Sequence, residues 1–359
     1  MPNKKRKYDY VLIMIVIVLV MVGLVILYSA SAYNGQNRFD DSFYYIKKQL
    51  FATGLGLLGM YIMAKTDYHI WIKYAVWGYL IAILLSVAVI FVGDEYNGSK
   101  RWLSLGPFSF QPSEVAKIAI ILFLAYTIAK IGKDIKKISR ILLVMLCILP
   151  IVGLVGMSNL STAVIILGIG ILLIFVSSPQ YIQFIGMGVT CISFLGIFLA
   201  LESYRLERLE IWRHPENYEK GYQTLQGLYA IGSGGIFGTG LGKSIQKLGF
   251  VPEAQNDMIF SIICEELGII GASTIMMLFL ILLWRFYVIA SRAKDLEGML
   301  IATGAFSHIM IQVVLNIAVV TNSIPNTGIT LPFISYGGTS VMFLLMEMGL
   351  VMNVSSTIE

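Results

Sequence analysis

The chain has 359 residues, of which 57% are hydrophobic and 13% charged, and its formal net charge at pH 7 is +5. Soluble domains carry about 25% charged residues, so the composition excludes an ordinary soluble protein and indicates one built for lipid. The three cysteines lack CxxC spacing and lie in apolar runs, and the three histidines are far apart. This pattern favours core cysteines over a disulfide framework or a metal site, and we expect no nucleic-acid partner.

Apolar segments of a length that crosses a bilayer, about 17–25 residues, recur along the chain. We therefore expect an all-α, polytopic integral membrane protein of about ten transmembrane helices, forming a single domain over 1–359. The predicted spans are 11–30, 49–64, 74–92, 114–131, 141–156, 160–176, 181–201, 258–284, 299–320 and 338–353.

The first span has an alternative interpretation as a secretory signal, because "NKKRK" precedes it and the small residues "ASA" follow at Ala30–Ala32. The apolar regions of secretory signals are about 7–15 residues long. This run is longer, so we favour a retained helix.

Lysine and arginine beside the spans predict the orientation, since both favour the cytoplasmic side. They cluster at 4–7, at 130–140 and at 285–294, which fall on one side if there are ten spans. We therefore expect both termini in the cytoplasm. The segments 93–113 and 202–257 are then outer loops, and loops this long inside a compact fold are usually functional.

The stretch "WLSLGPFSFQPSEVAKIAI" leads into the fourth span. Pro112 suits a helix start, and Ser113 with Glu114 can satisfy its free N–H groups. Glu114 and Lys117 form an i,i+3 pair on one face. An ionisable side chain at mid-membrane costs at least about 2.5–3.5 kcal/mol, so Lys117 should face the protein interior and have a partner. Spacing alone slightly favours a structural ion pair.

The large loop carries many charges of both signs and a decoy motif. "GTGLGKS" at Gly238–Ser244 resembles a phosphate-binding loop, but Phe237 stands where the motif requires its first glycine. We interpret it as a glycine-rich turn lying close to other backbone. The loop's charges are either a solvated surface or a cationic pocket for a phosphorylated ligand.

Asp257 ends the polar stretch "KLGFVPEAQNDMIF", directly before the eighth span. A carboxylate there can cap the helix or act as a general base on a lipid-borne substrate. On chemistry alone the two roles are evenly matched. Glu265 and Glu266 lie deeper in that span, and we expect them to be packing or polar-network residues.

Together these segments resemble the SEDS family (shape, elongation, division and sporulation), the FtsW/RodA/SpoVE-like polytopic glycosyltransferases. The resemblance runs almost end to end, and "VVTNSIP" and "ITLPFISYGG" are more similar to the FtsW/SpoVE branch of division and sporulation. The segments that carry it are "GLVILYSAS", "GSKRWLSLGPFSFQPSEVAK", "GYQTLQGLYAIGSGGIFGTGLGKS", "VPEAQNDMIF…EELG" and "LPFISYGGTS".

The resemblance implies a peptidoglycan glycosyltransferase that polymerises lipid II into glycan strands at the outer face of the bacterial cytoplasmic membrane. Its partners would be a class B penicillin-binding protein and other division or elongation proteins. The family's catalytic carboxylate, in P-E-A-x-x-D, falls on Asp257. Its Q-P-S-E-x-x-K motif falls on Gln111, Ser113, Glu114 and Lys117, which we expect at the substrate.

Such a reaction needs positive charge at the leaving diphosphate. Our candidates for holding it are Arg101, Lys117, Arg205 and Lys243. We predict no certain cofactor and leave a divalent cation such as Mg²⁺ open.

The chain departs from the family pattern at Ser158-Asn159-Leu160-Ser161-Thr162, where relatives commonly have P-D-L-G-T. Asn159 removes a negative charge, which puts cation binding there in doubt, although hydrogen bonding could survive. Two rival functions stay open, a lipid II flippase and a non-catalytic division scaffold. A flippase needs polar groups along its whole path, whereas the informative motifs here cluster at one face.

Overall fold

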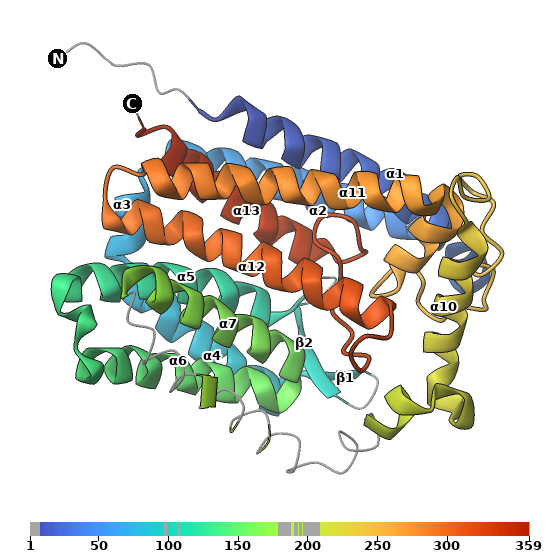
Figure 1. Cartoon of the computed structure of the whole chain (residues 1–359), viewed down its shortest axis with the longest axis horizontal. Helices are drawn as coiled ribbons and strands as arrows, with labels where there is room; N and C mark the ends of the chain where they lie inside the picture. Colours follow the sequence, from blue (N-terminus) through green and yellow to red (C-terminus); the bar gives the residue numbers. More distant parts are fainter. Residues whose placement is uncertain are drawn as a thin grey trace.

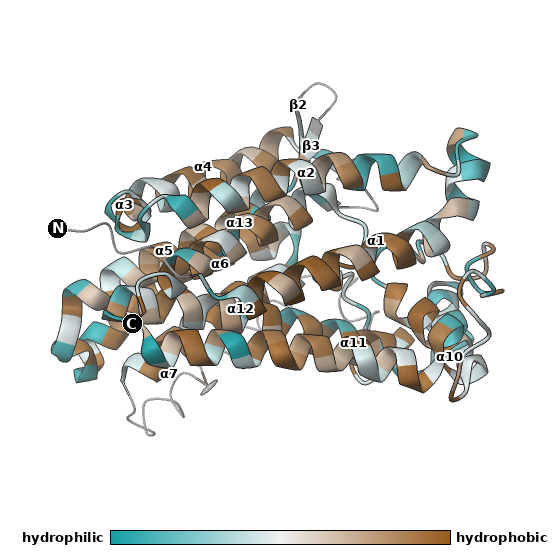
Figure 2. Cartoon of the chain, turned by 90° about the horizontal axis from the view of Figure 1, so that it is seen from above, coloured by the Kyte–Doolittle hydropathy of each residue, from teal (hydrophilic) through white to brown (hydrophobic). Residues whose placement is uncertain are grey.

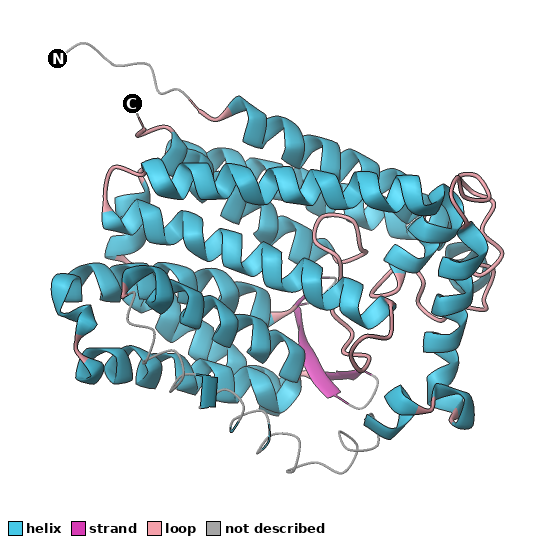
Figure 3. Ribbon diagram, viewed as in Figure 1, coloured by secondary structure: helices cyan, strands magenta, loops and turns pink. Residues whose placement is uncertain are grey.

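The computed structural model describes residues 8–96, 99–105, 108–178, 188–189, 193, 196 and 209–358. In these ranges the chain is a bundle of long helices with one small sheet (Figure 3). The long helices are α1 (Tyr10–Phe39), α2 (Tyr44–Lys65), α4 (Ala75–Val92), α5 (Pro112–Ile131), α6 (Ile138–Ser158), α7 (Leu160–Ser177), α11 (Ile259–Arg292), α12 (Leu296–Val320) and α13 (Gly338–Ser355). The shorter ones are α3 (Tyr68–Lys73), α10 (Tyr222–Gly234), η1 (Gly132–Lys136), η2 (Pro215–Asn217) and η3 (Glu219–Gly221).

Among the described residues, eight helices are long and apolar enough to cross a membrane, and they match eight of the ten predicted spans. These eight are α1, α4, α5, α6, α7, α11, α12 and α13. The second predicted span is α2, a 22-residue helix that packs along α13 and α1. The lysines and glycines of α2 lower its mean hydropathy. The seventh predicted span, 181–201, lies almost wholly outside the described residues. The chain is therefore a multi-pass membrane protein.

The start of α1 and the end of α13 lie at the same end of the bundle (Figure 1). The connections from α5 to α6 and from α11 to α12, which carry the predicted basic clusters 130–140 and 285–294, also lie there. We call this the terminal end. The opposite, loop end carries α10, the sheet and the segment 321–337. The first and last long helices therefore begin and end at one end of the bundle, in agreement with the predicted topology, and the membrane side that each end faces stays a prediction.

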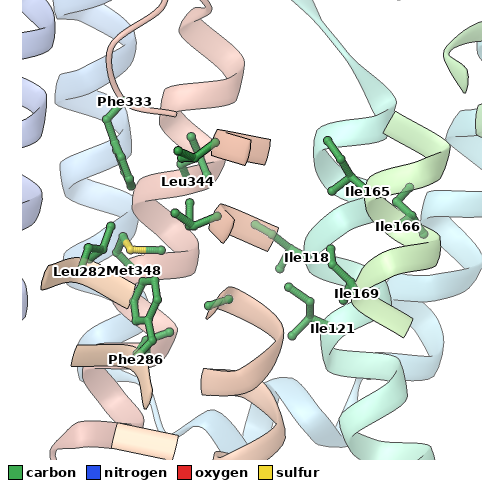
Figure 4. Packing of buried hydrophobic residues seen from close by; sticks show 14 of the residues in the cluster. Ile118, Ile121, Ile165, Ile166, Ile169, Leu282, Phe286, Phe333, Leu344 and Met348 are labelled. Atoms are coloured by element: carbon green, nitrogen blue, oxygen red, sulfur yellow. The ribbon is translucent and has the colours of Figure 1, made fainter. Parts of the chain in front are cut away.

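Hydrophobic residues line most of the length of α1 and α11, and hydrophilic residues gather toward helix ends and connections (Figure 2). Between α5, α7, α11, α12 and α13 the interior is packed with isoleucine, leucine, phenylalanine and methionine, including Ile121, Ile166, Phe286 and Met348 (Figure 4). Helix α12 packs against α5, α7, α11 and α13. Its polar side chains on those faces therefore point into protein rather than lipid.

The predicted loop 93–113 contains an antiparallel sheet that an all-α prediction does not include. Its strands are β1 (Asp94–Tyr96), β2 (Ser99–Leu105) and β3 (Phe108–Phe110), in the order β1-β2-β3. Strand β2 contacts α4, α5 and α6. The sheet thus holds the chain against the start of α5, where the motif residues lie.

Helix α11 is interrupted at Gly268, whose φ of 65° and ψ of −165° are not helical. A glycine-rich segment fits into the break: the N–H groups of Thr239 and Gly240 donate to the carbonyls of Glu265 and Glu266, at 2.9 and 3.0 Å. A side chain at Gly268 would collide with the backbone of this segment. "GTGLGKS" is therefore a turn lying close to other backbone, as predicted.

Candidate functional site

Asp257 lies in the turn that leads into α11, at the loop end, and only 9% of the residue is exposed. Its backbone carbonyl accepts a hydrogen bond from Asn316 Nδ2 on α12, at 2.9 Å. Its carboxylate Oδ1 accepts one from Gln223 Nε2 on α10, at 3.3 Å. The residue that caps α11 is Met258, with no side-chain capping bond, so Asp257 is not the N-cap of this helix.

Burial raises the pKa of Asp257 from its ordinary 3.8 to about 6, and the negative charge of Glu253 raises this pKa further. Backbone N–H groups and the long bond from Gln223 lower the pKa only in part. Among the described residues, no lysine or arginine forms an ion pair with Asp257. Asp257 is therefore ionised at neutral pH but poorly solvated, which suits a general base.

Helix α10 and the segment 321–337 both contact the turn that carries Asp257. Gln223 also accepts a hydrogen bond from Asn326 Nδ2 of the segment 321–337, at 3.3 Å. Further along that segment, Ser335 Oγ donates to the carbonyl of Asn256 at 2.7 Å. The motifs "VPEAQNDMIF" and "LPFISYGGTS", far apart in sequence, therefore pack together next to Asp257.

The Glu114–Lys117 pair forms as predicted. Lys117 Nζ lies 2.9 Å from Glu114 Oε1, and both side chains are buried. Lys117 also donates to Gln312 Oε1 on α12, at 3.2 Å. An ammonium has three hydrogens to donate, and the described residues offer hydrogen-bond acceptors for two of them.

Helix α12 connects this pair to Asp257. Gln312 and Asn316 are one turn apart, about 6 Å along the helix axis. Gln312 Nε2 donates to the carbonyl of Thr330 at 3.0 Å, and Asn316 Nδ2 donates to that of Ile329 at 2.7 Å. Sequence reasoning missed both amides, although polar side chains inside an apolar span are a signal of function.

Three further predicted substrate-binding residues, Arg101, Gln111 and Ser113, line one cavity of about 10 Å³ between α4, α5 and α6. Arg101 Nε donates to the carbonyl of Ser158 at 3.0 Å. Ser113 Oγ is buried and has no hydrogen-bond partner among the residues that the structure describes. The space suits about one water molecule, so a diphosphate does not fit it in this arrangement.

The remaining predicted residues lie apart from this site. Lys243 is exposed, and its side chain lies beside Gly240. Arg205 lies outside the described residues. Asn159 caps α7 by accepting from the N–H of Thr162 at 3.2 Å, so its hydrogen-bonding role is present.

Sequence reasoning did not single out Lys247, which is buried against α11 and α1. Its Nζ lies 2.6 Å from Glu266 Oε1 and 2.8 Å from Ser29 Oγ. Neighbouring Glu265 accepts hydrogen bonds from Ser244 Oγ and from the N–H of Ile245. Both glutamates are polar-network residues, as predicted.

No group of three or more histidine, cysteine, aspartate or glutamate side chains is placed to hold a metal ion in the part of the chain that the structure describes. The described residues do not by themselves form such a group. Magnesium is often held by one or two carboxylates together with substrate phosphates. A cation arriving with a diphosphate therefore stays a prediction.

Fold and site together define a polytopic helical membrane protein with a buried carboxylate and a buried lysine–glutamate pair toward one end of the bundle. Residues 9–359 match the FtsW/RodA/SpoVE family, described as cell cycle protein. The chain is 41% identical to stage V sporulation protein E of Bacillus subtilis, over 99% of each chain. It is 35% identical to the probable peptidoglycan glycosyltransferase FtsW of Trichlorobacter lovleyi, over 100% of this chain and 96% of that one.

Two solved structures are similar over nearly the whole chain. One belongs to a peptidoglycan synthase complex described as coordinating polymerization and crosslinking, with a TM-score of 0.82, 29% identity and 97% of each chain covered. The other is the rod shape determining protein RodA of Thermus thermophilus, with a TM-score of 0.73, 28% identity and 99% and 98% covered. The chain belongs to the FtsW/RodA/SpoVE family.

Proposed function

We propose that this protein is a peptidoglycan glycosyltransferase that polymerises lipid II at the outer face of the bacterial cytoplasmic membrane. Family membership and the names of its relatives support the activity. The observation that carries the proposal is Asp257, a buried carboxylate without a cationic partner among the described residues, framed by two motif segments at the loop end.

The reaction joins the 4-hydroxyl of one disaccharide unit to the anomeric carbon of another. The new C–O bond forms as the bond to the diphosphate breaks, and undecaprenyl diphosphate leaves with that bond's electron pair. Asp257 accepts the hydroxyl proton, and the configuration at the anomeric carbon inverts. Because diphosphate is already a good leaving group, the second carboxylic acid used in glycoside hydrolysis is not required. A positioned base supplies about 10²–10⁴ in rate.

Positive charge for the diphosphate comes, in this proposal, from Lys117, which keeps one uncommitted hydrogen among the described contacts. Lys117 is 2% exposed, so a substrate reaches it only if packing around it opens. The segment 321–337 is the element to move, since it contacts Gln312 through Thr330. Arg101, Arg205 and Lys243 remain candidates for contacts made earlier, as the headgroup arrives.

A class B penicillin-binding protein is the proposed partner, cross-linking the strands that this protein makes. Support comes from the similarity to a chain of a peptidoglycan synthase complex. The similarity to a stage V sporulation protein and to FtsW proteins favours a role in sporulation or division.

The direct test is to purify the full-length protein with its transpeptidase, add fluorescent lipid II in detergent or vesicles, and separate the products by size. Glycan strands from the wild type, absent with Asp257→Asn, support the proposal. Transfer of lipid II across the vesicle membrane without strands would instead indicate a flippase. Neither transfer nor strands from folded protein would favour a scaffold.

A further inference from the structure

A buried histidine–glutamate pair lies one helical turn beyond Gln312, deeper in the bundle. His308 Nδ1 on α12 is 2.8 Å from Glu347 Oε2 on α13. His308 Nε2 is 2.9 Å from Gln312 Oε1, the same oxygen that accepts from Lys117. Both members of the pair are almost fully buried. The reaction described above gives neither of them a task.

The neighbours of Gln312 show which way its amide points. A backbone carbonyl can only accept, so the side facing Thr330 must be the NH₂ group of Gln312. An ammonium can only donate, so the side facing Lys117 must be the oxygen. Two independent contacts therefore agree on the same amide orientation.

That orientation in turn shows which nitrogen of His308 carries a hydrogen. Gln312 Oε1 is an acceptor, so His308 Nε2 must carry a hydrogen and donate it. One further proton then lies between His308 Nδ1 and Glu347 Oε2, on either atom, because two lone pairs at 2.8 Å would repel. In either form the pair carries no net charge. In both forms Nε2 keeps a hydrogen that points at Gln312.

We propose that His308 and Glu347 are positioning residues for Lys117, acting through Gln312. Glu347 keeps a hydrogen on His308 Nε2, that N–H holds the Gln312 oxygen in place, and the oxygen aims the Lys117 ammonium so that its third hydrogen faces the substrate diphosphate. The inference rests on the proposed function for the identity of that anion. It adds two residues, on α12 and α13, to the substrate-binding site.

The test is a binding measurement on purified full-length protein in detergent, with undecaprenyl diphosphate as the probe, because no turnover occurs. Glu347→Leu removes the partner of His308 Nδ1, and we expect about tenfold weaker binding, the size of a typical coupling between residues in one network. Glu347→Gln can donate its amide hydrogen to Nδ1 and keep the tautomer, so we expect binding within about threefold of wild type. A purely structural role would not predict this rescue.

The matched control is Asn353→Leu on the same helix. Asn353 is buried, and among the described contacts its side chain bonds only backbone groups, the N–H of Tyr68 and the carbonyl of Ala64. We expect a lower melting temperature and unchanged affinity.

The route from Glu347 to Lys117 is tested in the double variant that combines Glu347→Leu with Lys117→Met. This variant should bind undecaprenyl diphosphate no more weakly than Lys117→Met alone. The inference is overturned if Glu347→Leu binds like wild type, if Glu347→Gln is as weak as Glu347→Leu, or if the loss persists undiminished without Lys117. Strand synthesis by the wild type is measured separately. An absence of strands counts against the proposed function, whereas the binding results for the Glu347 variants test the positioning role.

Discussion

Three buried carboxylates lie close together in sequence near the start of α11, and they have two opposite environments. Glu265 and Glu266 accept hydrogen bonds from Ser244, the N–H of Ile245, Ser29 and Lys247. Asp257 accepts one side-chain hydrogen bond at 3.3 Å and has no ion pair among the described residues. The two glutamates, the donor-rich group, therefore have several hydrogen-bond donors each, whereas Asp257 has few and is left able to accept a proton.

The difference separates structure from chemistry. A buried charge with every lone pair occupied holds segments together, here the glycine-rich loop, α1 and α11. A buried charge with few donors is destabilising unless something else favours it, and such residues cluster at functional sites. Lys117 is intermediate, with two acceptors among the described residues for its three hydrogens.

The largest expected effect is that of Asp257→Asn. An amide cannot take the hydroxyl proton, so the polymerisation rate should fall by about 10²–10⁴. The measurement is strand synthesis from fluorescent lipid II by purified protein. Near-normal synthesis would remove Asp257 from the base role.

The same variant should not be less stable. The folded-state pKa of about 6 lies above the ordinary 3.8, so ionisation of Asp257 destabilises the fold progressively as pH rises through that window. The neutral amide avoids this, and we expect Asp257→Asn to be about 1–3 kcal/mol more stable than wild type at neutral pH. The check is thermal unfolding at pH 4 and pH 7.5, where the difference should shrink at the lower pH.

Lys247→Met tests the donor-rich glutamates, Glu265 and Glu266. It leaves Glu266 buried without its cation, which costs about 3–5 kcal/mol, while the catalytic constants of the protein that remains folded should be close to normal. Adding Glu266→Gln should restore much of the stability. A variant of normal stability that cannot polymerise would reverse the assignment of this group.

Lys117→Met should reduce catalytic efficiency by about 10–100-fold, because one charge-assisted contact is worth about 1.5–3 kcal/mol. It should also destabilise by stranding Glu114. The double variant with Glu114→Gln should regain stability but not activity, unlike the Lys247 pair. If the double variant recovers both, the Glu114–Lys117 pair is only structural.

Lys243→Ala should have the smallest effect, less than about threefold in KM for lipid II, because its side chain is exposed beside Gly240. Initial rates at several lipid II concentrations measure it. A rise in KM above tenfold would place Lys243 at the diphosphate.

Sequence reasoning predicted most of the helical spans because the length of an apolar run and the basic residues beside it can be read from one segment of the chain. It also anticipated the Glu114–Lys117 pair, since i,i+3 spacing on a helix places the two side chains on one face. It missed the break at Gly268 and the Lys247–Glu266 pair, which depend on a loop folding back onto a helix from about 20 residues away. The contacts of Gln312, His308 and Glu347 arise between helices, and no spacing along one segment reveals them.

The central claim is that the Asp257 carboxylate acts as a base with a pKa of about 6. The most direct measurement is the pH dependence of kcat/KM for strand synthesis, in wild type and in Glu253→Gln. The wild-type rate should fall below pH ~6 as Asp257 becomes protonated. Removing the neighbouring negative charge should move that fall to lower pH. A rate that stays constant down to pH ~4.5, or a fall that Glu253→Gln leaves in place, would contradict the account.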